Sequence, residues 1–209
     1  MSVVLKWITP NAEEMIANIA RVSNPANRDN AETAPRLIRY LLKSKHWSPF
    51  EMANMCVEIT TDRATSAQII RHRSFTFQEF SQRYAEVPRP EMPDLRRQDL
   101  KNRQSSHSDL PEEVLNKHRA AIDDLFDQTH TLYKSMLTDG VAKETARAIM
   151  PMCSKTTIIM NGTIRSWLHY VEIRGEVATQ LEHRQVALAV KALIKEHLPC
   201  IYAAAWETV

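Results

Sequence analysis

The chain has 209 residues, of which 44% are hydrophobic and 25% are charged, and its formal net charge is +2. This size and composition are typical of a soluble globular protein, and we expect one domain over residues 1–209. A charge this close to zero excludes general attraction to nucleic acid, and no apolar run approaches the roughly 20 residues that a membrane span requires.

Hydrophobic spacing in the first third of the chain predicts two strands and three helices. The strands are expected at residues 3–8 and 52–61, and the helices at 11–22, at 31–45 and directly after residue 62. Asn11 and Asp62 are the expected N-terminal caps of two of these helices, because a short polar side chain can accept a hydrogen bond from a first-turn amide.

The middle of the chain contains a polar, charge-dense stretch that runs through residue 109 and is bracketed by Pro88, Pro90, Pro93 and Pro111. Proline interrupts regular structure, so we expect a long polar lid loop here. Residues 111–138 then predict a long helix that ends at Gly140, with an apolar side facing the core. That side consists of Val114, Leu115, Ala121, Ile122, Leu125 and Leu132.

The last third of the chain predicts three helices and one strand. The helices are expected at 143–150, at 163–174 with Thr163 as the cap, and at 178–197, and the strand at 155–161. Only 3 glycines occur, which favours helices over turn-rich sheets. We therefore predict an α+β fold in which helices pack on a small sheet.

A basic block in the first half of the chain carries the strongest functional signal. Arg71-His72-Arg73 is followed by seven residues and then by Ser81-Gln82-Arg83-Tyr84. Guanidinium groups bind phosphate through two parallel hydrogen bonds and stay charged at any working pH, although a solvated basic face is the simplest alternative. Phe75, Phe77 and Phe80 interleave with the polar residues, so the segment must partly bury, and buried arginines need anionic partners. The block therefore predicts a polyanionic ligand, most simply a nucleotide.

The helix after Thr163 presents a second polar set. Arg165, His169 and Glu172 lie four and three residues apart, so they share one helix face, which is also what a solvated face would show. Arg174 differs because it ends the helix just before a glycine, where its side chain can leave the helical path and pair with a ligand anion.

Three isolated positions suit either a ligand or a structural role. Arg147 lies in an otherwise apolar turn and can act as an ion-pair anchor or as a ligand contact. Glu51 joins a helix to a strand and can cap or pair structurally. Ser23 follows a helix and can be a plain cap or a hydroxyl that reaches a phosphate.

The cysteines are Cys56, Cys153 and Cys200, and their odd number and wide spacing argue against a disulfide framework and favour a reducing cytoplasm. Neither Cys153 nor Cys200 has a neighbour that would activate it as a nucleophile, and the histidines lack metal-ligand spacing. We therefore expect no metal, and chemistry from a cofactor or from positioned acid–base groups.

The basic block resembles the signature of flavin-dependent thymidylate synthases, in which Arg-His-Arg precedes a serine and an arginine at this spacing. Other landmarks of that family occur in the same order along nearly the whole chain. They are Arg21-Val22-Ser23, His46-Trp47-Ser48-Pro49-Phe50-Glu51, Gln68, Ala146-Arg147 before Pro151, Arg165-Ser166 and Arg174.

The resemblance implies an enzyme that makes dTMP from dUMP. Methylenetetrahydrofolate would supply the carbon, FAD reduced by NADPH would supply the hydride, and homotetramers would place active sites between subunits. The implied flavin contacts are Ser23, Ser48, Glu51, Arg71, His72, Arg73, Arg165 and His169, with His46 near the flavin and folate stack. The implied dUMP contacts are Gln68, Glu79, Ser81, Gln82, Arg83, Arg147 and Arg174. The chain departs from the usual pattern at Thr163 and Ala178, where many members have Asn and His as flavin contacts.

Three chemical roles follow for these residues. Arg174 held against the pyrimidine would favour an electron-rich ring deprotonated at N3 and is the implied catalytic residue. Ser81, Arg83 and Arg147 can hold the phosphate so that the ring lies flat on the flavin, and Arg71 with Arg73 can neutralise the flavin diphosphate. The rival hypothesis is a nucleic-acid-binding module that uses the same arginines on phosphates and the phenylalanines of the block for base stacking.

Overall fold

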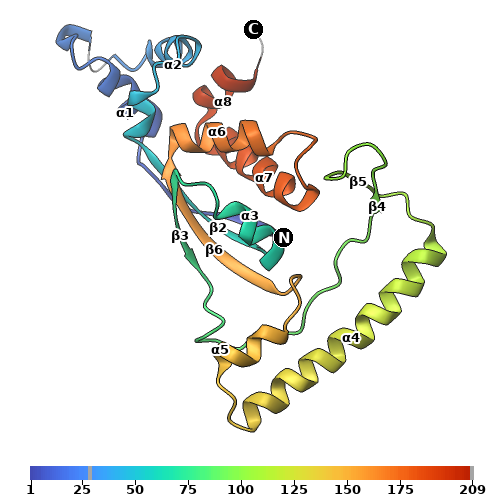
Figure 1. Ribbon diagram of the computed structural model, residues 1–209. Helices are drawn as coiled ribbons and strands as arrows, with labels where there is room; N and C mark the ends of the chain where they lie inside the picture. The colour runs from blue at the N-terminus through green and yellow to red at the C-terminus, as the bar shows by residue number, and fades with distance from the viewer. Residues whose placement is uncertain (28–29, 208–209) are drawn as a thin grey trace.

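The computed structural model describes residues 1–27 and 30–207, and it shows helices packed on a small antiparallel sheet (Figure 1). The sheet order is β1-β2-β6-β3, and every neighbouring pair of strands is antiparallel. The strands are β1 (Ser2–Ile8), β2 (Asn54–Asp62), β3 (Phe75–Glu79) and β6 (Lys155–Thr163). The predicted α+β class is confirmed.

The helices of the main body follow the predicted order, with short additions between them. They are α1 (Ala12–Ala20), α2 (Ala34–Lys43), α3 (Arg63–Ile69), α6 (Ile164–Arg174), α7 (Leu181–His197) and α8 (Pro199–Trp206). The short helical turns are η1 (Pro25–Asn27), η2 (Ser48–Glu51), α5 (Lys143–Ala146) and η3 (Arg147–Ile149). None of the helices in the described part of the chain is long and apolar enough to cross a membrane.

Alternation of burial along β6 shows how the core forms. Every second residue of this strand is buried, so one face of the sheet points toward α6 and α7. Ile158 and Met160 pack there with Trp167 of α6 and Val190 of α7 in one hydrophobic core. Because α6 begins directly after β6 and buries Trp167 in this core, the polar residues of α6 are placed on its other side.

Two of the three expected helix caps are confirmed. Asp62 accepts a hydrogen bond from the Thr65 amide at 2.7 Å, and Thr163 accepts one from the Ser166 amide at 3.1 Å. The cap prediction for Asn11 is wrong, because this residue adopts a left-handed conformation with φ of 50° and its side chain makes no cap hydrogen bond. Gly140 ends its helix as predicted, with φ of +86°.

Two elements were missed in the sequence. Residues of the basic block form β3, which pairs with β6 from Phe75 opposite Gly162 to Glu79 opposite Ile158. The helix α8 was also missed, and Pro199 occupies its first turn, where the missing amide hydrogen causes no loss.

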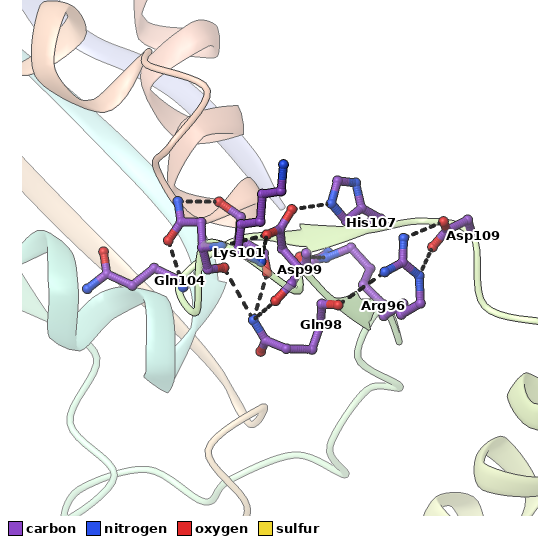
Figure 2. Close-up of polar contacts among 11 residues, drawn as sticks. Arg96, Gln98, Asp99, Lys101, Gln104, His107 and Asp109 are labelled. Atoms are coloured by element: carbon purple, nitrogen blue, oxygen red, sulfur yellow. Dashed lines mark hydrogen bonds and ion pairs between the residues drawn. The ribbon is translucent and has the colours of Figure 1, made fainter.

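The polar stretch before residue 111 is mostly loop, as predicted, and it also contains a small hairpin (Figure 2). It contains the two-stranded sheet of β4 (Arg97–Gln98) and β5 (Ser106–His107). Between them, Asp99 accepts hydrogen bonds from the backbone amides of Lys101 and Asn102, at 2.7 and 2.6 Å, and contacts His107 at 2.6 Å. These contacts, with the Asn102 amide first, lower the pKa of Asp99 to about 2. The hairpin is therefore stabilised by local polar contacts.

The long helix α4 (Glu112–Thr138) lies apart from the main layers in Figure 1, and its predicted inward side is only partly correct. Leu125 and Leu132 are 54% and 55% exposed, whereas Phe126 and Tyr133 are buried. The reason is that α4 contacts α5 and η3 instead of the main core, and a smaller cluster forms around Tyr133. The Tyr133 hydroxyl accepts a hydrogen bond from the Val87 amide at 3.1 Å.

Gly162 allows the close approach of β3 that positions the basic block. A Cβ at this glycine would lie 2.4 Å from Cδ1 of Phe75. We expect Gly162→Ala to lower the free energy of unfolding by about 1–3 kcal/mol, because overpacking displaces the ring. Urea denaturation measures this loss. The same substitution should cost less in a Phe75→Leu background, and an equal cost there would contradict the explanation.

Candidate functional site

The first group of predicted site residues converges near the start of β3. Nε of Arg174, at the end of α6, donates a hydrogen bond to Nε2 of His72 at 2.9 Å. Gln68 on α3 lies close by, with its Oε1 3.4 Å from Nδ1 of His183 on α7. The rings of His72 and His183 are both in contact with Tyr170, at centroid distances of 5.0 and 5.7 Å. Two segments that are far apart in the sequence, residues 68–72 and residues 170–183, therefore build one polar cluster, which we call the arginine–histidine cluster.

Both imidazoles of this cluster are held neutral at neutral pH. Burial, followed by the charge of Arg174, lowers the pKa of His72 and of His183 to about 4 in each case. Nε2 of His72 can therefore accept the hydrogen bond from Arg174 with its own proton on Nδ1. Burial also raises the pKa of the Tyr170 hydroxyl, which stays protonated. Arg174 has no ion-pair partner within residues 1–27 and 30–207, so its two terminal nitrogens remain available to an anionic or carbonyl ligand.

A chain of hydrogen bonds leads from Gln68 to the polar hairpin, and the sequence analysis did not find it. Gln68 contacts Gln180, and Nε2 of Gln180 donates to Oε2 of Glu182 at 2.9 Å. The other carboxylate oxygen of Glu182 accepts from Arg96 at 2.6 Å. Burial alone raises the pKa of Glu182, but the hydrogen bonds from Gln180, from its own backbone and from Arg96 outweigh it and lower the pKa.

A second group lies on the outer face of α6. Arg165 forms an ion pair with Glu51 of η2, and its guanidinium carbon lies 6.0 Å from the ring centroid of Trp47. Ser48 is the first residue of the same short turn. His169 is exposed on this helix face and contributes to the lowered pKa of His72. The predicted face of α6 therefore points away from the core, toward η2.

His46 and Ser23 lie in loops beside this region. The His46 ring makes an edge contact with Tyr40 at 5.8 Å, in the turn after α2. Ser23 is exposed in the turn after α1. Thr163 acts as the cap of α6, and Ala178 is exposed before α7, so the two departures from the family pattern have structurally ordinary positions.

Arg71 and Arg73 flank the arginine–histidine cluster and are both exposed. Neither forms an ion pair with any residue that the structure describes. Between Arg73 and Phe75, the backbone oxygen of Ser74 accepts a hydrogen bond from Ser166 of α6 at 3.3 Å. Arg71 and Arg73 thus expose two guanidinium groups in a segment that contacts α6, and such groups fit the diphosphate of a flavin dinucleotide.

The rings of the basic block do not form a surface for base stacking. Phe75 is only 7% exposed and lies against Trp167 at 4.6 Å, and Phe77 packs against the same core. Phe80 is 37% exposed. Stacking of successive nucleic-acid bases requires accessible aromatic faces, so this arrangement argues against the nucleic-acid-binding alternative.

A third group gathers around Glu144 at the opposite end of the sheet. Arg83 forms an ion pair with the Glu144 carboxylate at 3.2 Å, and Nε of Arg147 donates to the Glu144 backbone oxygen at 3.3 Å. Ser81 is exposed, and Gln82 is buried with its Nε2 lacking a hydrogen-bond partner in the described part of the chain. This set, which we call the Glu144 group, offers two cations and a hydroxyl at the surface.

Glu79 lies in its own network and serves the fold directly. Its Oε1 accepts hydrogen bonds from Ser66 at 2.6 Å and Thr156 at 2.9 Å and lies 2.6 Å from Arg63. These contacts fasten the end of β3 to α3. The implied dUMP contact of Glu79 therefore has only its second carboxylate oxygen to use.

The arginine–histidine cluster and the Glu144 group are far apart within one chain. Arg147 precedes β6 and α6 follows it, and the nine residues of this strand span roughly 26 Å. Figure 1 shows α5 and α6 at the two opposite ends of the sheet. Arg147 and Arg174 therefore belong to sets of residues at different ends of the sheet.

Comparisons with known proteins show the family to which the chain is similar. The family model described as thymidylate synthase complementing protein matches residues 4–200. A probable flavin-dependent thymidylate synthase of Paramecium bursaria Chlorella virus 1 is 48% identical over 191 residues, which cover 91% of this chain and 88% of the relative. The flavin-dependent thymidylate synthase of Synechocystis is 45% identical over 195 residues, covering 92% and 88%.

The fold is also that of a solved structure. The UMP/dUMP methylase PolB from Streptomyces cacaoi, in a complex with 5-Br dUMP, superimposes with a TM-score of 0.85 over 97% of this chain and 93% of that protein. Its 24% identity establishes the fold alone. Because the family model spans nearly the whole chain and both relatives align over most of their length, the chain belongs to the family of flavin-dependent thymidylate synthases.

Proposed function

We propose that this protein converts dUMP to dTMP, with methylenetetrahydrofolate as the carbon donor and NADPH-reduced FAD as the source of hydride. The observation that carries the proposal is the Arg174–His72 contact. One nitrogen of the guanidinium is held by a neutral imidazole at 2.9 Å, which leaves the two terminal nitrogens directed by that contact and free to bind a pyrimidine. A fixed cation beside N3 favours the deprotonated, electron-rich ring whose C5 acts as the nucleophile.

The residues of the second group fit FAD. Arg71 and Arg73 offer exposed guanidinium groups for the diphosphate, and the Arg165–Glu51 pair with Trp47 lies on the helix that this segment contacts through Ser74. His72, His169, Ser48 and Ser23 are the further proposed contacts, with His46 near the bound flavin and folate. When bound, FAD supplies the redox chemistry that no side chain of this protein can supply.

The Glu144 group of another subunit completes the site. Ser81, Arg83 and Arg147 would hold the dUMP phosphate, with Gln82 and Glu79 beside them, while Gln68 and Arg174 of a neighbouring chain would hold the base. The roughly 26 Å length of β6 between the two sets supports a homotetramer with shared sites. The three cysteines are free, which supports a cytoplasmic location.

The proposal is tested by the colour and the chemistry of the purified protein. We expect the absorption bands of an oxidised flavin in the visible range, and release of tritium from dUMP labelled at C5 when folate and NADPH are added. A colourless protein that also fails to take up added FAD would contradict the flavin assignment, and a flavin-loaded protein without tritium release would contradict the substrate.

The cysteines are expected to be dispensable for turnover. Burial is the main cause that raises the pKa of Cys153 and of Cys200, so both thiols are poor nucleophiles at neutral pH. The double substitution Cys153→Ala/Cys200→Ala should keep tritium release within about twofold of the parent protein, since no covalent step uses a thiol. Loss of turnover in a folded, flavin-loaded double variant would show that one thiol takes part.

A further inference from the structure

The hydrogen bonds between Gln68 and Glu182 run in one direction only. A carboxylate has acceptors and no donors, so the amide nitrogen of Gln180 must face Glu182, as its 2.9 Å contact shows. The oxygen of Gln180 therefore faces Gln68, and Gln68 must present its own amide nitrogen to it. The negative charge of Glu182 thus determines which end of the Gln68 amide is the donor.

The far end of the chain of contacts is consistent with this direction. With its nitrogen toward Gln180, Gln68 turns its oxygen toward Nδ1 of His183, at 3.4 Å. That nitrogen must then carry the imidazole proton, and Nε2 of His183 is left as a bare acceptor. Nε2 of His183 is indeed buried and makes no hydrogen bond to any part of the chain that the structure describes.

Arg96 keeps the carboxylate of Glu182 in place. Its side chain is only 10% exposed, it reaches Glu182 at 2.6 Å, and it also pairs with Asp94 at 2.9 Å. Glu182 lies in the first turn of α7, where a negative charge is favoured by the helix dipole. The polar hairpin therefore contributes a positive charge to a network that ends beside Arg174.

We propose that Glu182 and Gln180 are positioning residues that hold the Gln68 amide as a hydrogen-bond donor toward O4 of the pyrimidine. The proposal rests on the proposed function, because it takes Gln68 as a contact of the dUMP base. One N–H of Gln68 is used by Gln180, and the second is left for the ligand. The carbonyl oxygens O2 and O4 flank N3, which Arg174 would contact, and the proposal assigns O4 to the second N–H of Gln68.

Recognition of the base as uracil follows from this fixed direction. Uracil has an acceptor oxygen at C4, whereas cytosine has a donor amino group there. A donor that cannot turn over accepts the first and rejects the second, because two N–H groups would then oppose each other. If the amide of Gln68 were free to turn over, it would present its oxygen to cytosine equally well.

The test measures binding of dUMP and of dCMP to the FAD-loaded enzyme by titration calorimetry. Glu182→Gln replaces an acceptor-only group with an amide that can donate or accept, so both orientations of Gln180 and Gln68 become available. We expect the ratio of the dUMP affinity to the dCMP affinity to fall about tenfold, since one hydrogen bond changes its direction. Glu196→Gln, an exposed glutamate on the same helix, is the matched control and should keep the parent ratio.

A second variant separates this effect from a loss of folding. Gln180→Met removes the relay but leaves the Arg96–Glu182 ion pair intact, and it should reduce the ratio to the same extent. A folded, flavin-loaded Glu182→Gln or Gln180→Met enzyme with the parent ratio would overturn the inference. If the unmodified enzyme binds no dUMP and releases no tritium, then the proposed function has failed instead.

Discussion

Replacing Arg174 with alanine is expected to lower kcat for dTMP formation by roughly ten- to a hundredfold, with a smaller change in KM for dUMP. A charge-assisted hydrogen bond is worth on the order of 1.5–3 kcal/mol, and the contact of Arg174 with N3 is strongest when the ring carries negative charge in the transition state. Arg83→Ala should do the opposite and mainly raise KM, because a phosphate contact stabilises the bound ground state and the transition state equally.

Steady-state kinetics at saturating folate and NADPH measures both parameters. Arg174→Lys and Arg83→Lys should not restore the parent values, since lysine lacks the planar fork of donors. Arg119→Ala removes a 44% exposed arginine of α4 and serves as the control for loss of a surface charge. If Arg174→Ala changed only KM while Arg83→Ala lowered only kcat, the two roles would be assigned the wrong way round.

Mixing two impaired variants is expected to raise activity if the sites are shared between subunits, provided that activity is measured at a dUMP concentration well below the KM of the Arg83→Ala variant. Arg83→Ala damages the Glu144 group, and Arg174→Ala damages the arginine–histidine cluster. In a mixed tetramer, an intact arginine–histidine cluster of one chain meets an intact Glu144 group of another chain at some sites. Activity should therefore rise above that of either variant alone after subunit exchange, as tritium release at this dUMP concentration would show.

The contacts within one chain also supply a matched pair that should not recover. Within one chain Arg174 contacts His72, whereas Arg83 and Arg147 both contact Glu144. Arg83 and Arg147 both belong to the Glu144 group. When Arg83→Ala is mixed with Arg147→Ala, this group is damaged in every chain, so no mixed site is complete. Recovery of this pair, or no recovery of the first pair despite demonstrated exchange, would contradict the proposed arrangement.

Local sequence patterns were sufficient for most elements of the fold. Asp62 and Thr163 were predicted as caps because each cap hydrogen bond involves only four consecutive residues. The strands β2 and β6 and the helices α6 and α7 follow from periodic burial, which is again local. The elements that failed depend on distant partners: β3 is a strand only because it pairs with β6, and α4 keeps Leu125 exposed because it packs on η3 and α5 rather than on the main core.

The sequence by itself determined the family and the kinds of residue in the site, because the arginines, histidine and serines of residues 71–83 lie close together in the sequence at a defined spacing. Only the tertiary structure decided which of them meet. Arg174 and His72 are separated by more than a hundred residues and are joined by the packing of α6 on β6 and β3. The relay from Arg96 through Glu182 and Gln180 to Gln68 was invisible for the same reason, since a hydrogen bond forms wherever the chain brings a donor to an acceptor, and sequence spacing carries no record of that distance.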